Sequence, residues 1–209
     1  MLTLTPNTIT ITDLEQRFNL GYTDDLNFFP EWQNPLPELS AIEKERCDRL
    51  KTSFLYLLRY PPLLENTVKM VVLSPLLEMA GFYSPPFHIK SEASVEIVDQ
   101  ENSVTIKGNL DILVLWETLW ILVIESKKAT FSLEAGKAQL LSYLLASPQL
   151  AKQPIYGLLT NGSNFAFLKL AYHQQTPIYT LSDEFIIHNR DNGLYKVLQI
   201  LKHFAQTFS

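Results

Sequence analysis

Residues 108–128, GNLDILVLWETLWILVIESKK, constrain the fold of this chain more than any other segment. They comprise two apolar runs separated by a short turn, a pattern that is typical of a buried β-hairpin. Each run contains an acidic residue where a buried strand normally has none, Asp111 in the first and Glu125 in the second. Lys127 follows Glu125 by two residues, so both side chains project from the same face. The sequence therefore predicts two carboxylates and one amine on a rigid sheet.

The register of this hairpin decides whether the two acids meet. If residues 117–119 form the turn, Trp116 lies opposite Trp120 and Asp111 lies opposite Glu125. Side chains directly opposite each other are about 4.5–5.5 Å apart at Cβ. A shift of one residue would pair Asp111 with Ser126 and turn Glu125 to the other face. The expected register is thus a sharp structural prediction.

Two carboxylates this close repel each other when both are ionised, and burial increases the repulsion. Such a pair persists by sharing a proton, by binding a cation or by facing water. A magnesium ion suits these ligands, because it commonly uses one or two carboxylates together with water and substrate phosphate. The alternative is structural: Asp111 and Lys127 form an ion pair at the sheet edge, and Glu125 is solvated.

Composition limits the classes of protein to which the chain can belong. Of its 209 residues, 46% are hydrophobic and 19% are charged, which predicts a globular protein with a sizeable core. The net charge of −5 gives no general attraction for nucleic acid, so such a ligand would need a local patch. The candidate lysines for that patch are Lys127, Lys128, Lys137 and Lys152. The single cysteine, Cys47, and the lack of an apolar leader or a membrane-length segment indicate a cytoplasmic location away from membranes.

Helix and strand signals alternate along the rest of the chain. Residues 1–40 are expected to be irregular, because three prolines interrupt residues 29–39. Helices are expected at 41–60, 64–79, 133–147 and from 191 onward, and strands at 87–98, on both sides of the hairpin turn, and at 155–160, 164–170 and 177–181. Ser40 with Glu43 predicts a capping box, Ser132 an N-cap, and Gly81 a C-cap. Pro75 is expected to kink the 64–79 helix or to split it in two, and a turn is expected at 99–102.

This order predicts an α/β (or α+β) fold, with a mixed central β-sheet flanked by helices. The chain is expected to divide into an N-terminal extended and helical region, residues 1–60, which packs on a main domain at residues 61–209.

Four motifs in this order resemble the PD-(D/E)xK nuclease superfamily, which has the restriction-endonuclease-like fold. They are GNLDILVL, WILVIESKK, the AQLLSY helix and the strand that ends in LLTNG, and the resemblance covers about residues 64–170. Within the superfamily, the segment is most similar to the N-terminal nuclease region of type I restriction enzyme R subunits, including small stand-alone proteins of this kind from cyanobacteria. Asn109 and Leu110 stand where the superfamily name places a proline, so the match is relaxed there.

The resemblance implies a restriction-endonuclease-like domain with magnesium-dependent DNA endonuclease activity, in which Mn²⁺ could replace Mg²⁺, and a role in restriction or defence. Asp111, Glu125 and the carbonyl of Ser126 would bind the metal. Lys127 would stabilise developing charge or position the attacking water. Glu65, near the start of the second helix, matches an acid that often assists the metal, although it could equally be a favourable charge at a helix N-terminus.

The helix after the hairpin supplies further candidates. Gln139 and Tyr143 match a Q-x-x-x-Y motif of this superfamily and share a helix face. They would contact the DNA backbone or support the site, together with Lys128. The alternative is that Tyr143 belongs to the core and Gln139 is solvated.

The absence of one ATP-binding motif from the sequence bears on the partners that we expect. R subunits contain a motor, but no G-x-x-x-x-G-K-[ST] loop occurs here, so a motor or specificity subunit would act in trans. A paired cut in DNA would suit a homodimer. Two other functions remain open: a catalytically inactive nucleic-acid-binding or partner-binding module on the same fold, and an unrelated α+β protein whose ion pair is structural.

Overall fold

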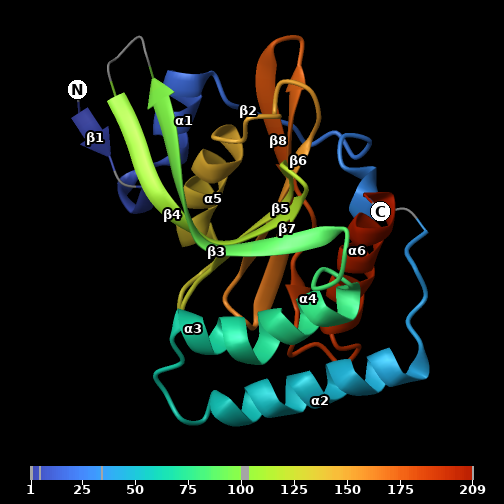
Figure 1. Cartoon of the computed structure of the whole chain (residues 1–209). Coiled ribbons are helices and arrows are strands. Elements are labelled where there is room, and N and C mark those ends of the chain that lie inside the picture. Colours follow the sequence, from blue (N-terminus) through green and yellow to red (C-terminus); the bar gives the residue numbers. More distant parts are fainter. Residues whose placement is uncertain (1, 5, 34, 100–103, 209) are drawn as a thin grey trace.

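The computed structural model of the chain describes residues 2–4, 6–33, 35–99 and 104–208 (Figure 1). The strands are β1 (Leu2–Leu4), β2 (Gly21–Tyr22), β3 (Phe87–Asp99), β4 (Val104–Trp116), β5 (Leu119–Ser126), β6 (Ile155–Thr160), β7 (Asn164–His173), β8 (Thr176–Leu181) and β9 (Phe185–Ile186). The helices are α1 (Ile11–Phe18), α2 (Ala41–Leu57), α3 (Glu65–Val68), α4 (Ser74–Ala80), α5 (Glu134–Leu145) and α6 (Leu194–Thr207). Short helical turns are η1 (Pro6–Thr8), η2 (Pro30–Trp32) and the π-helical η3 (Lys69–Leu73). No helix in these ranges is long and apolar enough to cross a bilayer.

The nine strands of the described ranges form one mixed sheet, in the order β1-β4-β5-β6-β7-β8-β2, while β3 pairs with β4 and β9 with β7. Three pairs are parallel, namely β1 with β4, β5 with β6 and β2 with β8, and the others are antiparallel. Helices lie against both faces of this sheet (Figure 1). The predicted α/β class, with a mixed central sheet flanked by helices, is confirmed.

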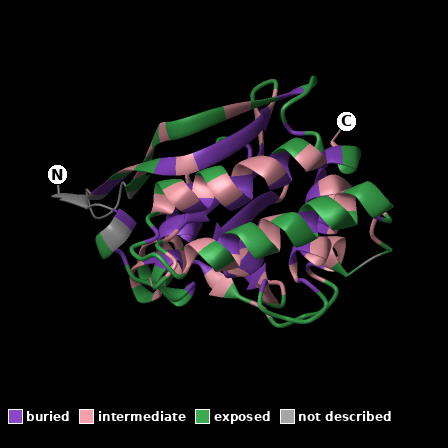
Figure 2. Ribbon diagram, turned by 90° about the horizontal axis from the view of Figure 1, so that it is seen from below, coloured by how far each residue is buried: buried purple, intermediate pink, exposed green. Residues whose placement is uncertain are grey.

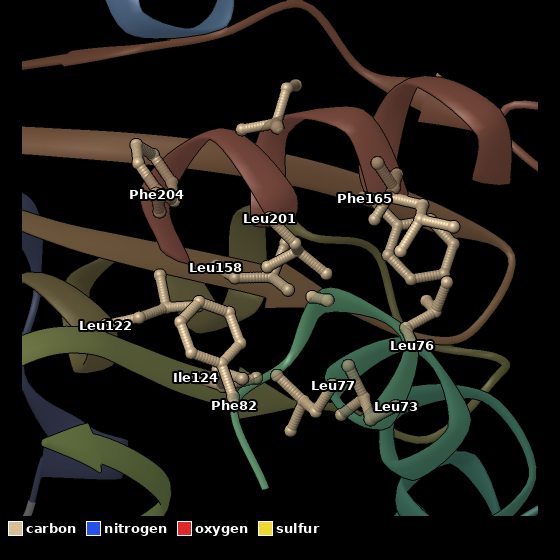
Figure 3. Close-up of a cluster of buried hydrophobic side chains, with 14 of the residues drawn as sticks. Leu73, Leu76, Leu77, Phe82, Leu122, Ile124, Leu158, Phe165, Leu201 and Phe204 are labelled. Carbon is tan, nitrogen blue, oxygen red and sulfur yellow. The ribbon is translucent and has the colours of Figure 1, made fainter. Parts of the chain in front are cut away.

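Successive side chains of the central strands point to opposite faces of the sheet, so the sheet has a separate core on each face. Ile112 and Ile124 face one core, which α2, α3, η3, α4 and α6 cover, whereas Leu113 and Val123 face the other, which α1 and α5 cover. The first core is the larger, and Figure 3 shows α4 and α6 meeting there over strands β5, β6 and β7. Figure 2 shows the exposed outer side of the helices in front of the buried strands. Both faces of the sheet are therefore buried, which explains the long apolar runs in the sequence.

The register of the β4–β5 hairpin differs between its two ends. Pairing of Leu113 with Val123 confirms the prediction near the acids. The register then shifts after Val114, so that Trp116 pairs with Leu119 and the turn contains only Glu117 and Thr118. The predicted three-residue turn and the pairing of Trp116 with Trp120 are wrong. A β-bulge absorbs the one-residue difference before it reaches the acids.

The N-terminal 40 residues are more ordered than the prolines predict. Helix α1 begins with a capping box in which Thr10 and Asp13 bond each other's backbone N–H groups. Strand β1 pairs in parallel with β4, and β2 pairs in parallel with β8. The expectation of an irregular segment is therefore wrong. These elements are short, and Leu14 is the buried residue of α1, so they leave little hydrophobic pattern in the sequence.

Other boundaries agree with the sequence or differ by a few residues. The Ser40–Glu43 capping box and the Gly81 C-cap, with φ +95°, are confirmed. Ser132 does not cap α5, whose N-cap is Leu133 with no side-chain cap hydrogen bond. The helical stretch from 65 to 80 becomes a π-helix at η3, and α4 then begins just before Pro75. A proline is tolerated there, because a residue in the first turn of a helix has no intrahelical partner for an N–H group. The predicted turn at 99–102 lies largely outside the described residues, and β9 was not predicted.

Candidate active site

Asp111 lies on β4 where the pairing with both neighbouring strands is interrupted. β4 and β5 pair as far as Ile112 and Ile124. On the other side, β3 pairs with β4 before and after Glu92, which has a left-handed φ of 52°. Here the Asp111 side chain bonds to β5: Oδ2 accepts hydrogen bonds from the backbone N and the Oγ of Ser126, both at 2.7 Å.

The other oxygen of Asp111 contacts a lysine from a different layer. Lys69 on η3 donates from Nζ to Asp111 Oδ1 at 2.7 Å, and both side chains are largely buried. Lys69 was not among the residues predicted for the site. A signal existed, because Lys69 is the one lysine between residues 52 and 89 and stands in an apolar helical segment. Its contact with Asp111, 42 positions away, could not be predicted from spacing.

Glu125 is the most buried acid of the site, with only 3% of its surface exposed. Its Oε1 accepts a hydrogen bond from Lys127 Nζ at 2.8 Å, whereas its Oε2 is buried and has no hydrogen-bond partner among the described residues. Burial and then the charge of Asp111 raise the pKa of Glu125 to about 7, Lys127 opposes this shift, and Glu65 adds to it. Glu125 is therefore not the solvated acid of the structural alternative, and Asp111 contacts Lys69 rather than Lys127.

A chain of buried polar groups holds Lys127. Its Nζ donates to Gln139 Oε1 at 2.5 Å, Gln139 Nε2 donates to the Tyr143 hydroxyl at 2.9 Å, and that hydroxyl donates to the carbonyl of Asn109 at 2.9 Å. Burial raises the pKa of Tyr143, so the hydroxyl stays protonated. The chain links β5 through α5 to β4, two residues before Asp111. It fixes the amine relative to both carboxylates.

Gly136 makes room for the stem of Lys127 against α5. A Cβ at this position would lie 2.9 Å from Lys127 Cε and 2.6 Å from Leu159 Cδ1. Real Cβ atoms do not approach other atoms so closely, so any larger residue would push the lysine or the helix away. The glycine in LEAGKAQ therefore helps to position the amine.

Removing the Tyr143 hydroxyl tests this polar chain. We expect Tyr143→Phe to lower the free energy of unfolding by about 1–3 kcal/mol, because it leaves the buried Gln139 amide and the Asn109 carbonyl each short of a partner. Denaturant unfolding measures the loss. Tyr172→Phe, at a tyrosine that is 46% exposed, is the control and should change stability by less than about 0.5 kcal/mol. Equal effects of the two substitutions would contradict the polar chain.

The remaining candidates lie at the edge of the site or outside it. Glu65 begins α3, close enough for its charge to act on Glu125. Lys128 is exposed, with its Nζ 5.8 Å from the centre of the Phe131 ring. Lys137 pairs with Glu134 at 2.7 Å. Of the four lysines of the candidate patch, Lys127 is held inside the site, and the others do not contact its carboxylates in the described structure.

The chain is similar to several solved chains. One of them is a fragment assigned as an HsdR subunit of a type I restriction enzyme from Vibrio vulnificus YJ016, with 20% sequence identity and a TM-score of 0.40. The match covers 66% of this chain and 26% of that chain, so this chain spans about a quarter of that structure. No family model and no curated protein matches. At this distance, function has to be inferred from the contacts within the site.

The carboxylates can be tested for their fit to a metal ion. In the described part of the chain, no group of three or more His, Cys, Asp and Glu side chains is placed to hold one. Asp111 and Glu125 form a two-carboxylate set, which suits Mg²⁺ because this ion completes its shell with water and phosphate oxygens. Oε2 of Glu125 is buried with no hydrogen-bond partner among the described residues, which leaves one oxygen of this carboxylate available to a cation. The donor set therefore fits a hard divalent cation.

The raised pKa of Glu125 predicts a pH dependence of stability without metal. The pKa is about 7 in the folded chain, whereas an unperturbed glutamate has a pKa of 4.5, so the folded state binds this proton more tightly than the unfolded state does. The stabilising contribution is complete below about pH 4.5 and is lost as the pH rises through about 7. The groups that act on Glu125 are Asp111, Lys127 and Glu65.

Comparison with Glu125→Gln isolates this contribution, since other groups titrate in both proteins. In EDTA, we expect the free energy of unfolding of the wild type, relative to Glu125→Gln, to fall by on the order of 3 kcal/mol between pH 4.5 and 7.5. Denaturant unfolding at a series of pH values measures it. A difference between the two proteins that stays constant with pH would show that the Glu125 pKa is not raised.

Proposed function

We propose that this chain is a magnesium-dependent DNA endonuclease of the PD-(D/E)xK type and a component of a restriction or defence system. The main support is that Asp111 and Glu125 follow the last pair of β4 and β5, close enough for the charge of Asp111 to raise the pKa of Glu125, beside a Lys127 that Gln139 holds in place. A buried carboxylate oxygen of Glu125 without a partner adds to this, because such an atom is costly unless a cation or proton completes it. The motifs that resemble the superfamily contain these same residues.

Each residue has a defined role in the proposed reaction. Asp111 and Glu125, with the Ser126 carbonyl, hold the metal, which supplies an activated water and positive charge for the attacked phosphate. Lys127 keeps an ammonium group beside the reacting phosphate, where it stabilises the charge that develops on the oxygens. Gln139 and Tyr143 position that ammonium group through their hydrogen bonds.

Two residues outside this group complete the proposal. Glu65 assists at the metal from the start of α3, and Lys128, which is exposed, contacts a DNA phosphate. A homodimer, or a motor or specificity subunit that acts in trans, would deliver the site to DNA. The basis for these partners is the resemblance to type I restriction enzyme R subunits.

A second function is favoured by one specific observation. Asp111 and Glu125 each already contact a lysine ammonium group, Lys69 and Lys127. A site neutralised in this way could serve a binding module that no longer cleaves DNA. Such a module would bind DNA with a strong dependence on salt and would show no cleavage with either Mg²⁺ or Mn²⁺.

Incubation of the purified chain with plasmid and linear DNA separates these two functions. The nuclease proposal predicts cleavage in Mg²⁺ or Mn²⁺ and none in EDTA. Salt-dependent DNA binding without cleavage in either metal would favour the binding module. A chain that neither cleaves nor binds DNA would contradict both.

A further inference from the structure

Lys69 occupies the position at Asp111 that a metal ion would need. Ser126 takes the Oδ2 of Asp111 through two hydrogen bonds, which leaves Oδ1 as the oxygen that is free to bind a cation. Lys69 Nζ lies 2.7 Å from that oxygen. An ammonium group and a divalent cation repel each other at such distances, so each weakens the binding of the other at Oδ1.

Lys127 does not compete in the same way. It binds Oε1 of Glu125 and leaves Oε2 without a partner, so a metal ion has an oxygen of Glu125 available while Lys127 stays in place. Lys127 is also held by Gln139. Lys69 has one hydrogen bond from its ammonium group in the described structure, the one to Asp111. Lys127 is therefore held in place by a second partner, whereas Lys69 is held only by its ion pair with Asp111 among the described contacts.

The space beside Lys69 is large enough for a second conformation of its side chain. A cavity of about 330 Å³ adjoins the ion pair and is lined by Lys69 and Asp111 together with Asn66, Met70, Tyr83 and Glu92. The flexible stem of a lysine can turn into such a space without any backbone movement. Glu92, which is exposed, offers a second carboxylate in the same cavity. Lys69 also belongs to the π-helical turn η3, and such turns are frequent at functional sites.

We propose that Lys69 is a competitor for the metal site that is built into the fold. Its ammonium group holds Asp111 while no metal ion is bound and moves into the adjoining cavity when one binds. Lys69 thereby sets the metal affinity of the site, because the metal can bind only to the fraction of molecules in which this ion pair is open. This inference rests on the proposed function, since it assumes that Asp111 is a metal ligand.

Metal affinity measured by calorimetry with Mn²⁺, without DNA, tests the inference. If the ion pair is closed in nine molecules out of ten, removing the ammonium group tightens binding by about 10-fold. We therefore expect Lys69→Met to bind Mn²⁺ about 10-fold more tightly than the wild type, and Lys69→Arg, which keeps the charge, to bind no more tightly. A role for Lys69 in folding alone would change stability and leave the affinity of the folded protein unchanged.

Lys107→Met is the matched control, because it also removes one positive charge from an ion pair, here the exposed pair of Lys107 with Glu96 at 3.1 Å. It should bind Mn²⁺ as the wild type does. Lys69→Gln provides a second neutral variant if Lys69→Met does not fold. Equal Mn²⁺ affinity in the wild type and the neutral variants, with binding lost in Asp111→Asn, would overturn this inference alone. No Mn²⁺ binding by any of them would overturn the proposed function with it.

Discussion

Replacing Asp111 by asparagine should lower the rate of magnesium-dependent DNA cleavage by about 10²–10³-fold or more, the range seen when one charge-stabilising group is removed from an active site. The amide keeps one oxygen to accept the hydrogen bonds from Ser126 but loses the negative charge that a metal ion requires. Lys127→Met should have an effect of similar size, because it removes the ammonium group next to Glu125. Initial rates of plasmid cleavage under saturating Mg²⁺ measure both.

The control is a hydrogen-bonded carboxylate that lies outside the site. Asp48 on α2 accepts hydrogen bonds from Tyr195 at 2.7 Å and from Asn192 at 2.9 Å. Asp48→Asn should keep the cleavage rate within a few fold of the wild type, while circular dichroism shows all the variants folded. Full activity in folded Asp111→Asn or Lys127→Met would remove that residue from the mechanism.

The second large effect concerns stability. Phe204 lies on α6 (Figure 3) and is 1% exposed. Its ring centre is 4.6 Å from that of Tyr156 and 5.9 Å from that of Phe167. We expect Phe204→Ala to lower the free energy of unfolding by about 3–5 kcal/mol, because it removes a large buried ring and leaves a cavity. Denaturant unfolding, followed by circular dichroism, measures this loss.

Phe131→Ala is the control for this substitution, since Phe131 is 46% exposed and lies outside both cores. Its loss should cost less than about 1 kcal/mol. A small effect at Phe204 would mean that α6 is not part of the core. It would also mean that the face of the sheet opposite α5 is covered less tightly than the structure shows.

The part of the site that follows from local pattern could be predicted from the sequence. Asp111, Glu125 and Lys127 lie on two consecutive strands, and alternation with a period of two places the last two on one face. The pairing of Leu113 with Val123 was therefore predictable. The shared helix face of Gln139 and Tyr143 was also predictable, because residues four apart lie on one side of a helix. Their hydrogen bond and the burial of Gln139 were not, since a solvated Gln139 was an equal alternative.

Contacts between distant segments could not be predicted in this way. Lys69 meets Asp111 only because η3 packs on the face of the sheet opposite α5, and nothing in the spacing of these residues indicates it. The bulge after Val114 depends on a two-residue turn, whereas the sequence WETLW also allows three residues. Strands β1 and β2 are two or three residues long and owe their structure to their partners β4 and β8. Such elements have too few residues for a pattern to show.

The most direct test of the proposed metal site is the position of Mn²⁺ in a crystal of the protein, located by its anomalous scattering. We expect one peak about 2 Å from an oxygen of Asp111 and an oxygen of Glu125, with Lys127 still hydrogen-bonded to Glu125. A crystal grown at saturating Mn²⁺ that shows no peak between these two carboxylates, with Lys69 still on Asp111, would contradict the proposal.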